Sequence, residues 1–226
     1  MRIVISRRPV RAGLLATGVA GLLCLGVASC GGDGDEEVAD KDVAGTRLCG
    51  GDAVSADASK ALKVITGTSR FGTTAETSTV AHAATELVEA WPRSTGGRDD
   101  VCRIYTADGT SDFALRVTWG LKGGPPTGTP APDFTVLKMG ERTLAAANRA
   151  SVRFACRSDR FPESTKAAHI AIGVERWGMP TEPEDNVEAL KDAYATVAHS
   201  FSLAMAKELG CEENGGLPAK PVLDPA

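Results

Sequence analysis

The feature that most constrains the fold is a long amphipathic pattern near the C-terminal end of the chain. From Val187 to Ala204 the apolar residues recur every three or four positions, which is the spacing of one face of an α-helix. Thr181 and Glu184 form a capping-box pattern before it, and Gly210 ends it. We predict a helix of about 26 residues, roughly 39 Å long, whose apolar face needs a second layer to cover it.

A β-sheet is the expected second layer. Between Asp112 and Leu121 apolar residues alternate with more polar ones, which is the period of a half-buried strand, and the turn at Asp108-Gly109 joins this run to residues 101–105 as a hairpin. Alanines favour a helix in residues 141–149, but the segment is short, so a loop stays an alternative there. The predicted strands cover residues 101–105, 112–121, 134–139, 151–157 and 169–177.

Two shorter helices are predicted on the N-terminal side of the sheet. Ser55 can cap the first, which Gly67 ends, and Ser78 or Thr79 can cap the second, which Pro92 stops. The predicted fold class is therefore α+β: an antiparallel sheet of four or five strands, with the long C-terminal helix packed on it and two shorter N-terminal helices.

The first thirty residues have the pattern of an export signal. Four arginines and no acidic residue precede an apolar stretch from Ala12 to Ser29. Val27-Ala28-Ser29-Cys30 then resembles the lipobox of bacterial lipoproteins. By that resemblance residues 1–29 are a signal peptide, and Cys30 carries a diacylglyceryl thioether that attaches the protein to the outer face of the cell membrane. An uncleaved anchor is the alternative. Ser6-Arg7-Arg8 also resembles a twin-arginine signal, so the export route stays open.

Charge divides the rest of the chain. Removal of residues 1–29 takes away four arginines and no acid, which leaves 21 basic and 29 acidic residues. Six of those acids lie in residues 30–46, which we interpret as an extended, flexible tether. Residues 47–211 are predicted to form a single domain, and the Gly- and Pro-rich residues 212–226 a disordered tail. No basic stripe follows the chain, so nucleic acid is not an expected partner.

Four cysteines remain for the exported domain: Cys49, Cys102, Cys156 and Cys211. An even number in an exported protein predicts two disulfides, and three pairings are open. We prefer Cys49 with Cys102 and Cys156 with Cys211, because each bond then closes a loop within one half of the domain. A metal site is the alternative, but the spacing contains no Cys-x-x-Cys pair.

No catalytic constellation stands out. His82, His169 and His199 are far apart and form no metal-binding pair, and no Gly-x-Ser-x-Gly motif is present. We interpret the histidines as structural or solvated, and the three tryptophans (Trp91, Trp119 and Trp177) as core or partly buried residues. Asp99-Asp100 is placed in a loop, and Glu184-Asp185 in the first turn of the last helix. We predict no catalytic residue, no metal and no cofactor.

The chain also resembles small lipoproteins of streptomycetes and related actinobacteria. The resemblance lies in the lipobox, the acidic tether, Leu48-Cys49-Gly50-Gly51 and Phe154-Ala155-Cys156-Arg157-Ser158, and in a composition rich in Ala, Gly, Thr and Arg. It implies location and lipid modification alone, because families of this kind generally carry no assigned activity.

The expected function is that of a non-catalytic lipoprotein that binds a protein partner or belongs to an envelope assembly. This hypothesis predicts a groove or apolar patch on the sheet without a perturbed ionisable cluster. The alternative is a module that binds a small lipid or wall-derived ligand in a closed apolar cavity between sheet and helix; an envelope enzyme is favoured least. Any site is expected between the sheet face opposite the long helix and the loop at residues 123–132.

Overall fold

The computed structural model describes residues 42–91, 96–107, 113–161, 166–177 and 186–226. These residues belong to one compact unit, Val38–Ala226. The predicted signal peptide, Cys30 and most of the predicted tether lie outside the described residues. Within the described ranges, no helix combines the length and the apolar character that a membrane span requires.

The main sheet has six strands, all paired antiparallel, and not the four or five expected. Their spatial order is β3-β4-β8-β7-β6-β5, and β3 and β4 form the expected hairpin. The strands are β3 (Arg98–Tyr105), β4 (Phe113–Lys122), β5 (Thr135–Leu137), β6 (Arg142–Ala146), β7 (Arg149–Cys156) and β8 (Ala168–Arg176).

The additional strand is β6, in the segment whose sequence left helix and loop open. Its residues pair with β5 on one side and with β7 on the other, and Thr143 and Ala145 are fully buried. Backbone pairing on both sides therefore overrides the helix preference of its alanines, which is a weak effect compared with tertiary context.

A second, two-stranded sheet corrects the predicted extent of the tether. β1 (Asp42–Ala44) pairs antiparallel with β2 (Arg70–Gly72), so that Val43 lies opposite Phe71. Gly45–Gly50 follows as a 3-10 segment. The flexible-tether prediction was wrong for residues 42–46, because Val43 packs against the core and the backbone of β1 has a partner strand.

Three α-helices complete the domain, each with a side-chain cap at its N-terminus. They are α1 (Ala56–Thr66), capped by Ser55, α2 (Val80–Ala90), capped by Thr79, and α3 (Val187–Glu208), capped by Asn186. α3 has 22 residues, about 33 Å at 1.5 Å per residue, so it is shorter than expected. The predicted capping box at Thr181 and Glu184 lies outside the described residues.

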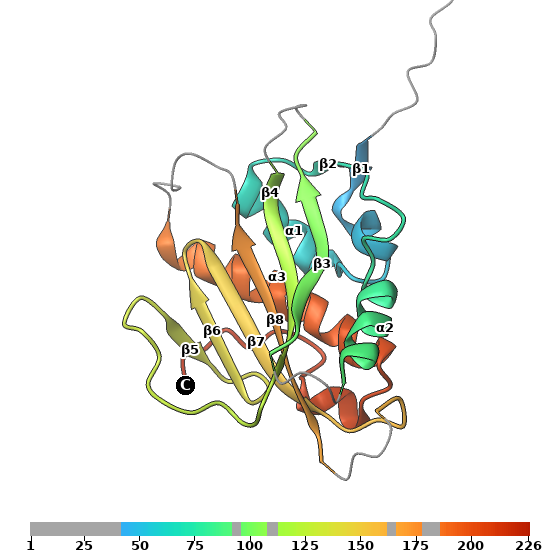
Figure 1. The fold of residues 1–226 in the computed structure, drawn as a ribbon. Helices are drawn as coiled ribbons and strands as arrows, with labels where there is room; N and C mark the ends of the chain where they lie inside the picture. The colour runs from blue at the N-terminus through green and yellow to red at the C-terminus, as the bar shows by residue number, and fades with distance from the viewer. Residues whose placement is uncertain (1–41, 92–95, 108–112, 162–165, 178–185) are drawn as a thin grey trace, which may run out of the picture. The chain divides into compact units, whose positions relative to one another are not determined.

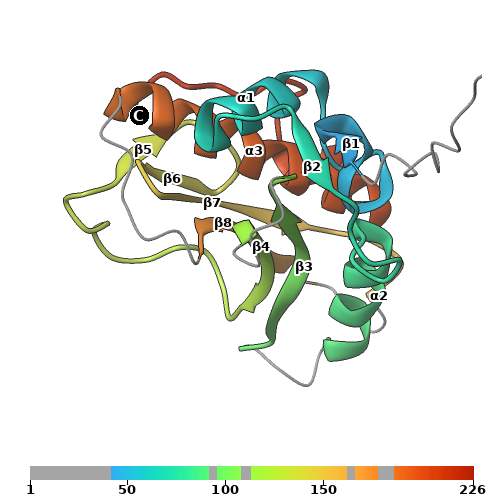
Figure 2. The same cartoon turned by 90° about the horizontal axis from the view of Figure 1, so that it is seen from above.

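The helices cover one face of the main sheet. α3 packs across β6, β7 and β8, α2 contacts β3 and β4, and α1 packs on α3. Figure 1 shows α3 crossing behind the strands, and Figure 2 shows α1 and α3 on the same side of the sheet. The side chains between sheet and α3 are 0 to 1% exposed: Val152, Phe154, Ile170, Ile172, Val174, Tyr194, Val197 and Phe201. We call the opposite face of the sheet the open face.

The strand register defines which residues lie on the open face. They alternate with the buried residues of each strand and lie opposite one another: Lys122 faces His169, Gly120 faces Ala171, and Thr118 faces Gly173. The open-face positions of the three central strands are Arg116, Thr118, Gly120 and Lys122 in β4, His169, Ala171, Gly173 and Glu175 in β8, and Arg149, Ser151, Arg153 and Ala155 in β7.

Both preferred disulfides are confirmed. Cys49 is bonded to Cys102 with their Cα atoms 5.8 Å apart, and Cys156 to Cys211 with their Cα atoms 4.9 Å apart. The first bond joins the 3-10 segment to β3. The second joins the end of β7 to the residue that follows α3 and its terminal turn.

The predicted disordered tail is part of the fold, and this prediction was wrong. After a short 3-10 segment at Glu212–Gly216, Leu217 is 5% exposed and the Pro218 carbonyl accepts a hydrogen bond from His199. Pro225 pairs with Leu137, and the Ala226 N–H donates to the Val136 carbonyl at 2.9 Å. A Gly- and Pro-rich composition does not prevent docking, because Leu217 still has the core to pack against.

Candidate functional site

The candidate site is a pocket of about 250 Å³ on the open face. Its floor consists of small residues at the centre of the sheet, Gly120, Ala171 and Gly173, where the lack of longer side chains leaves a hollow. The charged residues that line it come from four strands: Arg98, Lys122, Arg149, Arg153 and Glu175. We call this hollow the cationic pocket.

The pocket adjoins the loop at residues 123–132. Arg153 donates from Nη2 to the Gly124 carbonyl at 2.6 Å, and Arg142, its neighbour across β6 and β7, donates to the Thr127 carbonyl at 3.3 Å. These two contacts tie the loop to the open face. The site therefore lies in the region where the sequence led us to expect one, opposite α3 and next to this loop.

The four cations of the pocket differ in how their charge is balanced. Arg149 pairs with Asp133 at 2.7 Å and lies over the ring of Phe134, and Arg98 pairs with Glu175 at 3.5 Å. Arg153 donates a hydrogen bond to a neutral carbonyl, and its Nε is buried without a hydrogen-bond partner among the described residues. Lys122 has neither a hydrogen bond nor an ion pair to any residue in the described part of the chain.

The surroundings of Lys122 also change its pKa. Burial lowers the pKa of its ammonium group, and the positive charges of Arg153 and Arg98 lower that pKa further. The lining holds four basic residues and one acidic residue, a net charge of +3, whereas the whole chain has a net charge of −4. A concentration of positive charge in a hollow of an acidic protein favours an anionic occupant.

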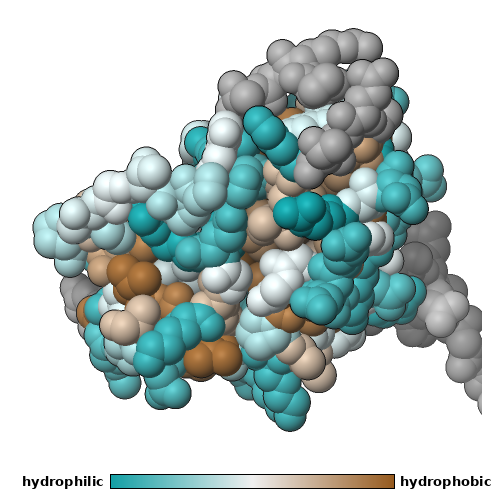
Figure 3. All heavy atoms as spheres, turned by 90° about the horizontal axis from the view of Figure 1, so that it is seen from below, coloured by the Kyte–Doolittle hydropathy of each residue, from teal (hydrophilic) through white to brown (hydrophobic). Residues whose placement is uncertain are grey.

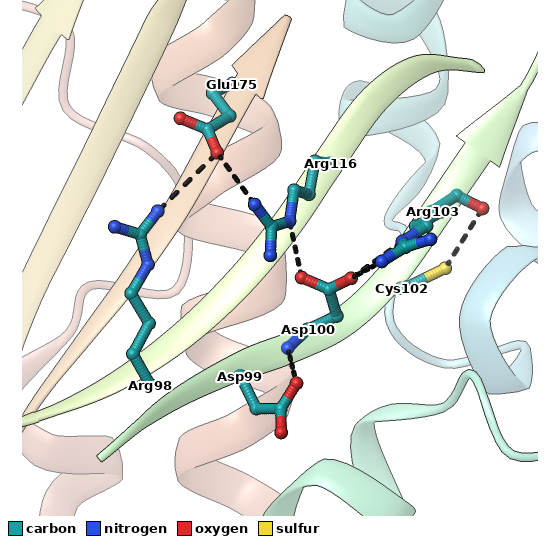
Figure 4. Close-up of polar contacts among 7 residues, drawn as sticks. All are labelled: Arg98, Asp99, Asp100, Cys102, Arg103, Arg116 and Glu175. Carbon is teal, nitrogen blue, oxygen red and sulfur yellow. Dashed lines mark hydrogen bonds and ion pairs between the residues drawn. The ribbon is translucent and has the colours of Figure 1, made fainter. Parts of the chain in front are cut away.

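A network of ion pairs holds Arg98 at the rim of the pocket (Figure 4). Asp100 accepts hydrogen bonds from Arg103 at 2.7 Å and from Arg116 at 2.5 Å. Glu175 lies 3.8 Å from Arg116 and 3.5 Å from Arg98. The hydrogen bond and the charge of Asp100 raise the pKa of Arg103. Because two arginines share Glu175, this carboxylate does little to neutralise the rest of the pocket.

The three histidines that we considered in the sequence lie at separate places in the structure. His82 is 3.3 Å from Glu86 on the surface of α2, and His199 is buried in α3, where it donates from Nε2 to the Pro218 carbonyl at 2.8 Å. Burial lowers the pKa of His199. His169 lies on the open face, with Nδ1 2.8 Å from a carboxylate oxygen of Glu141. In the described residues no three His, Cys, Asp or Glu side chains gather as a metal site would require.

Two other expectations need correction. Asp99 and Asp100 lie in β3, and not in a loop, because this strand begins three residues earlier than predicted. Trp119 is 4% exposed and Trp91 packs edge-on against Phe161, as expected, but Trp177 is 48% exposed and lies 5.1 Å from the Arg116 guanidinium. Trp177 directly follows the last residue of β8, where the strand leaves the covered part of the sheet. Glu184 and Asp185 lie outside the described residues.

Sequence reasoning did not find the cations of the pocket. Arg149 and Arg153 are four residues apart in β7, on the face opposite Val152 and Phe154, and Lys122 ends the alternating run of β4. Their alternation with buried residues was a signal that they share a sheet face. That these strands lie side by side is a property of the topology, which spacing along the chain does not contain.

Comparison with known proteins adds no identification. No protein-family model, curated protein or solved structure matches the chain. The functional signal in the described residues is therefore the geometry of the cationic pocket.

Proposed function

We propose that the protein is a non-catalytic binding lipoprotein of the cell envelope. In this proposal residues 1–29 are a signal peptide, and Cys30 carries a diacylglyceryl group that holds the protein at the outer face of the cell membrane. The lipobox pattern Val27-Ala28-Ser29-Cys30 supports the anchor, and the two disulfides are consistent with an oxidising location outside the cytoplasm. The resemblance to actinobacterial lipoproteins belongs to the same proposal.

The cationic pocket carries the proposal that the domain binds a small ligand. The partner-binding hypothesis anticipated an apolar patch on the sheet without a perturbed ionisable cluster. The open face instead has a hollow lined by Lys122, which has no ion pair among the described residues, and by Arg98 and Arg153, whose charges lower its pKa. Seen from below, the surface shows apolar patches separated by hydrophilic side chains (Figure 3). The charged lining of the hollow favours a small ligand over a broad apolar protein interface.

The place of the ligand differs from the one anticipated for a small-ligand module. A closed cavity between sheet and helix was expected, but that space is filled by fully buried side chains, including those of Tyr194, Phe154 and Phe201. The pocket lies on the other side of the sheet and opens to the surface. The ligand therefore does not need to pass through the core of the domain.

Native mass spectrometry of the acylated protein, extracted from its own membrane in mild detergent, tests this function. We expect a bound mass beyond that of the acylated chain. Ala171→Leu should remove it, because the larger side chain fills the floor of the pocket. Ala155→Leu is the matched control, because it lies on the open face outside the pocket lining. A bare acylated monomer, or a bound mass that Ala171→Leu leaves unchanged, would contradict the proposal.

A further inference from the structure

The donors of the cationic pocket converge on its floor. If Gly120 carried a Cβ, that atom would lie 3.5 Å from the Nζ of Lys122, so the ammonium group is folded over the centre of the sheet. A Cβ at Gly173 would lie 3.0 Å from the Oγ1 of Thr118, which places this hydroxyl over the same floor. Arg98 and Arg153 line the pocket beside them. Positive and hydroxyl donors therefore surround one small space.

Several of these donors have no partner in the part of the chain that the structure describes. Lys122 has no polar partner in the described part of the chain, and the hydroxyl groups of Thr118 and Ser151 make no hydrogen bond to a described residue. The carboxylates of Glu141 and Glu175 are already engaged, the first with His169 and the second with Arg98 and Arg116. Unpaired, partly desolvated cations destabilise a fold, so a group that would neutralise them is the missing counterpart.

We propose that the cationic pocket binds the phosphate group of a small molecule or of a lipid headgroup, with Lys122, Arg98 and Arg153 as the cationic ligands and Thr118 and Ser151 as hydroxyl donors. This inference rests on the proposed binding function and assigns its ligand class. A phosphate accepts hydrogen bonds from several directions and carries up to two charges, which suits donors from three strands better than a single planar carboxylate does.

The size of the pocket limits the ligand. A volume of about 250 Å³ lies just below the roughly 300 to 1,000 Å³ of typical small-molecule pockets. It therefore holds a phosphate and a short organic substituent, and the rest of a larger molecule must extend to the surface. Phe134, which also lines the pocket, offers an apolar contact for such a substituent.

Chemical acetylation of Lys122 measures occupancy of the pocket directly. An acetylating ester reacts with the neutral form of an amine. Because the pKa of Lys122 is lowered, a larger fraction of this amine is neutral below pH 10. Bound phosphate blocks this amine and raises its pKa, and each unit of that rise lowers the reactive fraction about tenfold. With the full-length acylated protein, we expect inorganic phosphate to slow acetylation of Lys122 several-fold. The exposed Lys138, outside the pocket lining, is the internal control.

Two variants separate binding from folding. Phosphate should raise the Tm of the wild-type protein, because a ligand that binds the folded state stabilises it. Lys122→Met should lose this phosphate-dependent rise but keep or increase the Tm measured without phosphate, since it removes a desolvated charge. Lys138→Met should retain the full phosphate effect.

Vesicles distinguish the two sources of the phosphate. If phosphatidylglycerol vesicles protect Lys122 from acetylation more than phosphatidylcholine vesicles do, the phosphate belongs to an anionic lipid headgroup. If inorganic phosphate protects Lys122 and the two kinds of vesicle do not differ, the phosphate belongs to a small molecule. Both results support the inference. Equal acetylation of Lys122 with and without phosphate and with both vesicles would overturn it. If Ala171→Leu still removed a bound mass in that case, the binding function would stand and only the ligand class would be wrong.

Discussion

At the scale of single residues, some polar groups are not satisfied by the described part of the chain. Partial burial and the charges of Arg153 and Arg98 lower the pKa of Lys122, and the Nε of Arg153 is buried without a hydrogen-bond partner among the described residues. Such groups lower the stability of a fold unless something else balances them. The predicted strand at residues 151–157 contains Arg153, but the one at residues 112–121 stops before Lys122. The sequence could not show that these two residues and Arg98 line one pocket.

The buried hydroxyl of Tyr194 allows a test at this scale that does not involve the pocket. The Tyr194 side chain in α3 is fully buried, its hydroxyl has no hydrogen-bond partner among the described residues, and burial raises the pKa of the phenol. Tyr194→Phe removes a desolvated polar atom and keeps the ring. We expect the free energy of unfolding to rise by about 1 kcal/mol in urea denaturation. A decrease of that size would show that the hydroxyl makes a stabilising contact.

At the scale of elements, periodicity predicted the helices and strands whose signals lie within one segment of the chain. α1 and α2 follow from spacing and caps that are local in the chain, and the β3-β4 hairpin from alternation and a turn signal. The spacing also predicted α3, but its cap, Asn186, was not predicted. β6 does not, because its alanines favour a helix and only the pairing with β5 and β7 makes it a strand. The C-terminal segment was also missed, since its few apolar residues become informative only once the core they contact is known.

His199 links the C-terminal segment to the pH dependence of stability. Its Nε2–H donates to the Pro218 carbonyl, and burial lowers its pKa below the ordinary value of 6.5. Between pH 6.5 and that lowered pKa the unfolded chain binds more protons than the folded domain. The contribution of His199 is therefore complete above pH 6.5 and is lost as the pH falls through this window.

A variant isolates this effect from other titrating groups. His199→Gln retains an N–H donor for the Pro218 carbonyl but has no group that titrates in this range. We expect the Tm of the wild-type protein to fall more than that of His199→Gln when the pH is lowered from 7 to 5. His82→Gln is the control, because His82 is exposed on α2. Parallel decreases for the wild-type protein and His199→Gln would show that His199 does not control the pH dependence.

At the scale of the whole molecule, the proposed lipid anchor at Cys30 precedes a domain that has one helix-covered and one open sheet face. The even number of cysteines predicted two disulfides, but the pairing was only a preference among three, which the structure bears out. For the position of the pocket, the sequence indicated only the sheet face opposite the long helix and the neighbouring loop at residues 123–132. Its chemistry was not, because the residues that create it come from β3, β4, β7 and β8 and are brought together by the strand order.

The anchor has a direct genetic test. Cys30→Ser removes the thiol that would carry the lipid, so the protein should move from the membrane fraction to the soluble or secreted fraction. Cys24→Ser is the matched control, because this cysteine lies within the predicted signal peptide and should leave the membrane attachment unchanged. If Cys30→Ser remains in the membrane with residues 1–29 still attached, the uncleaved-anchor alternative is correct.

The most direct test of the central claim, that the open face binds an anion, is a crystallographic one. Tungstate is a tetrahedral oxyanion like phosphate, and its position can be located by anomalous scattering in crystals of the protein. We predict a peak in the cationic pocket, within hydrogen-bond distance of Lys122 and Arg153. Occupied tungstate sites elsewhere, with none in a pocket that is free of lattice contacts, would contradict the assignment.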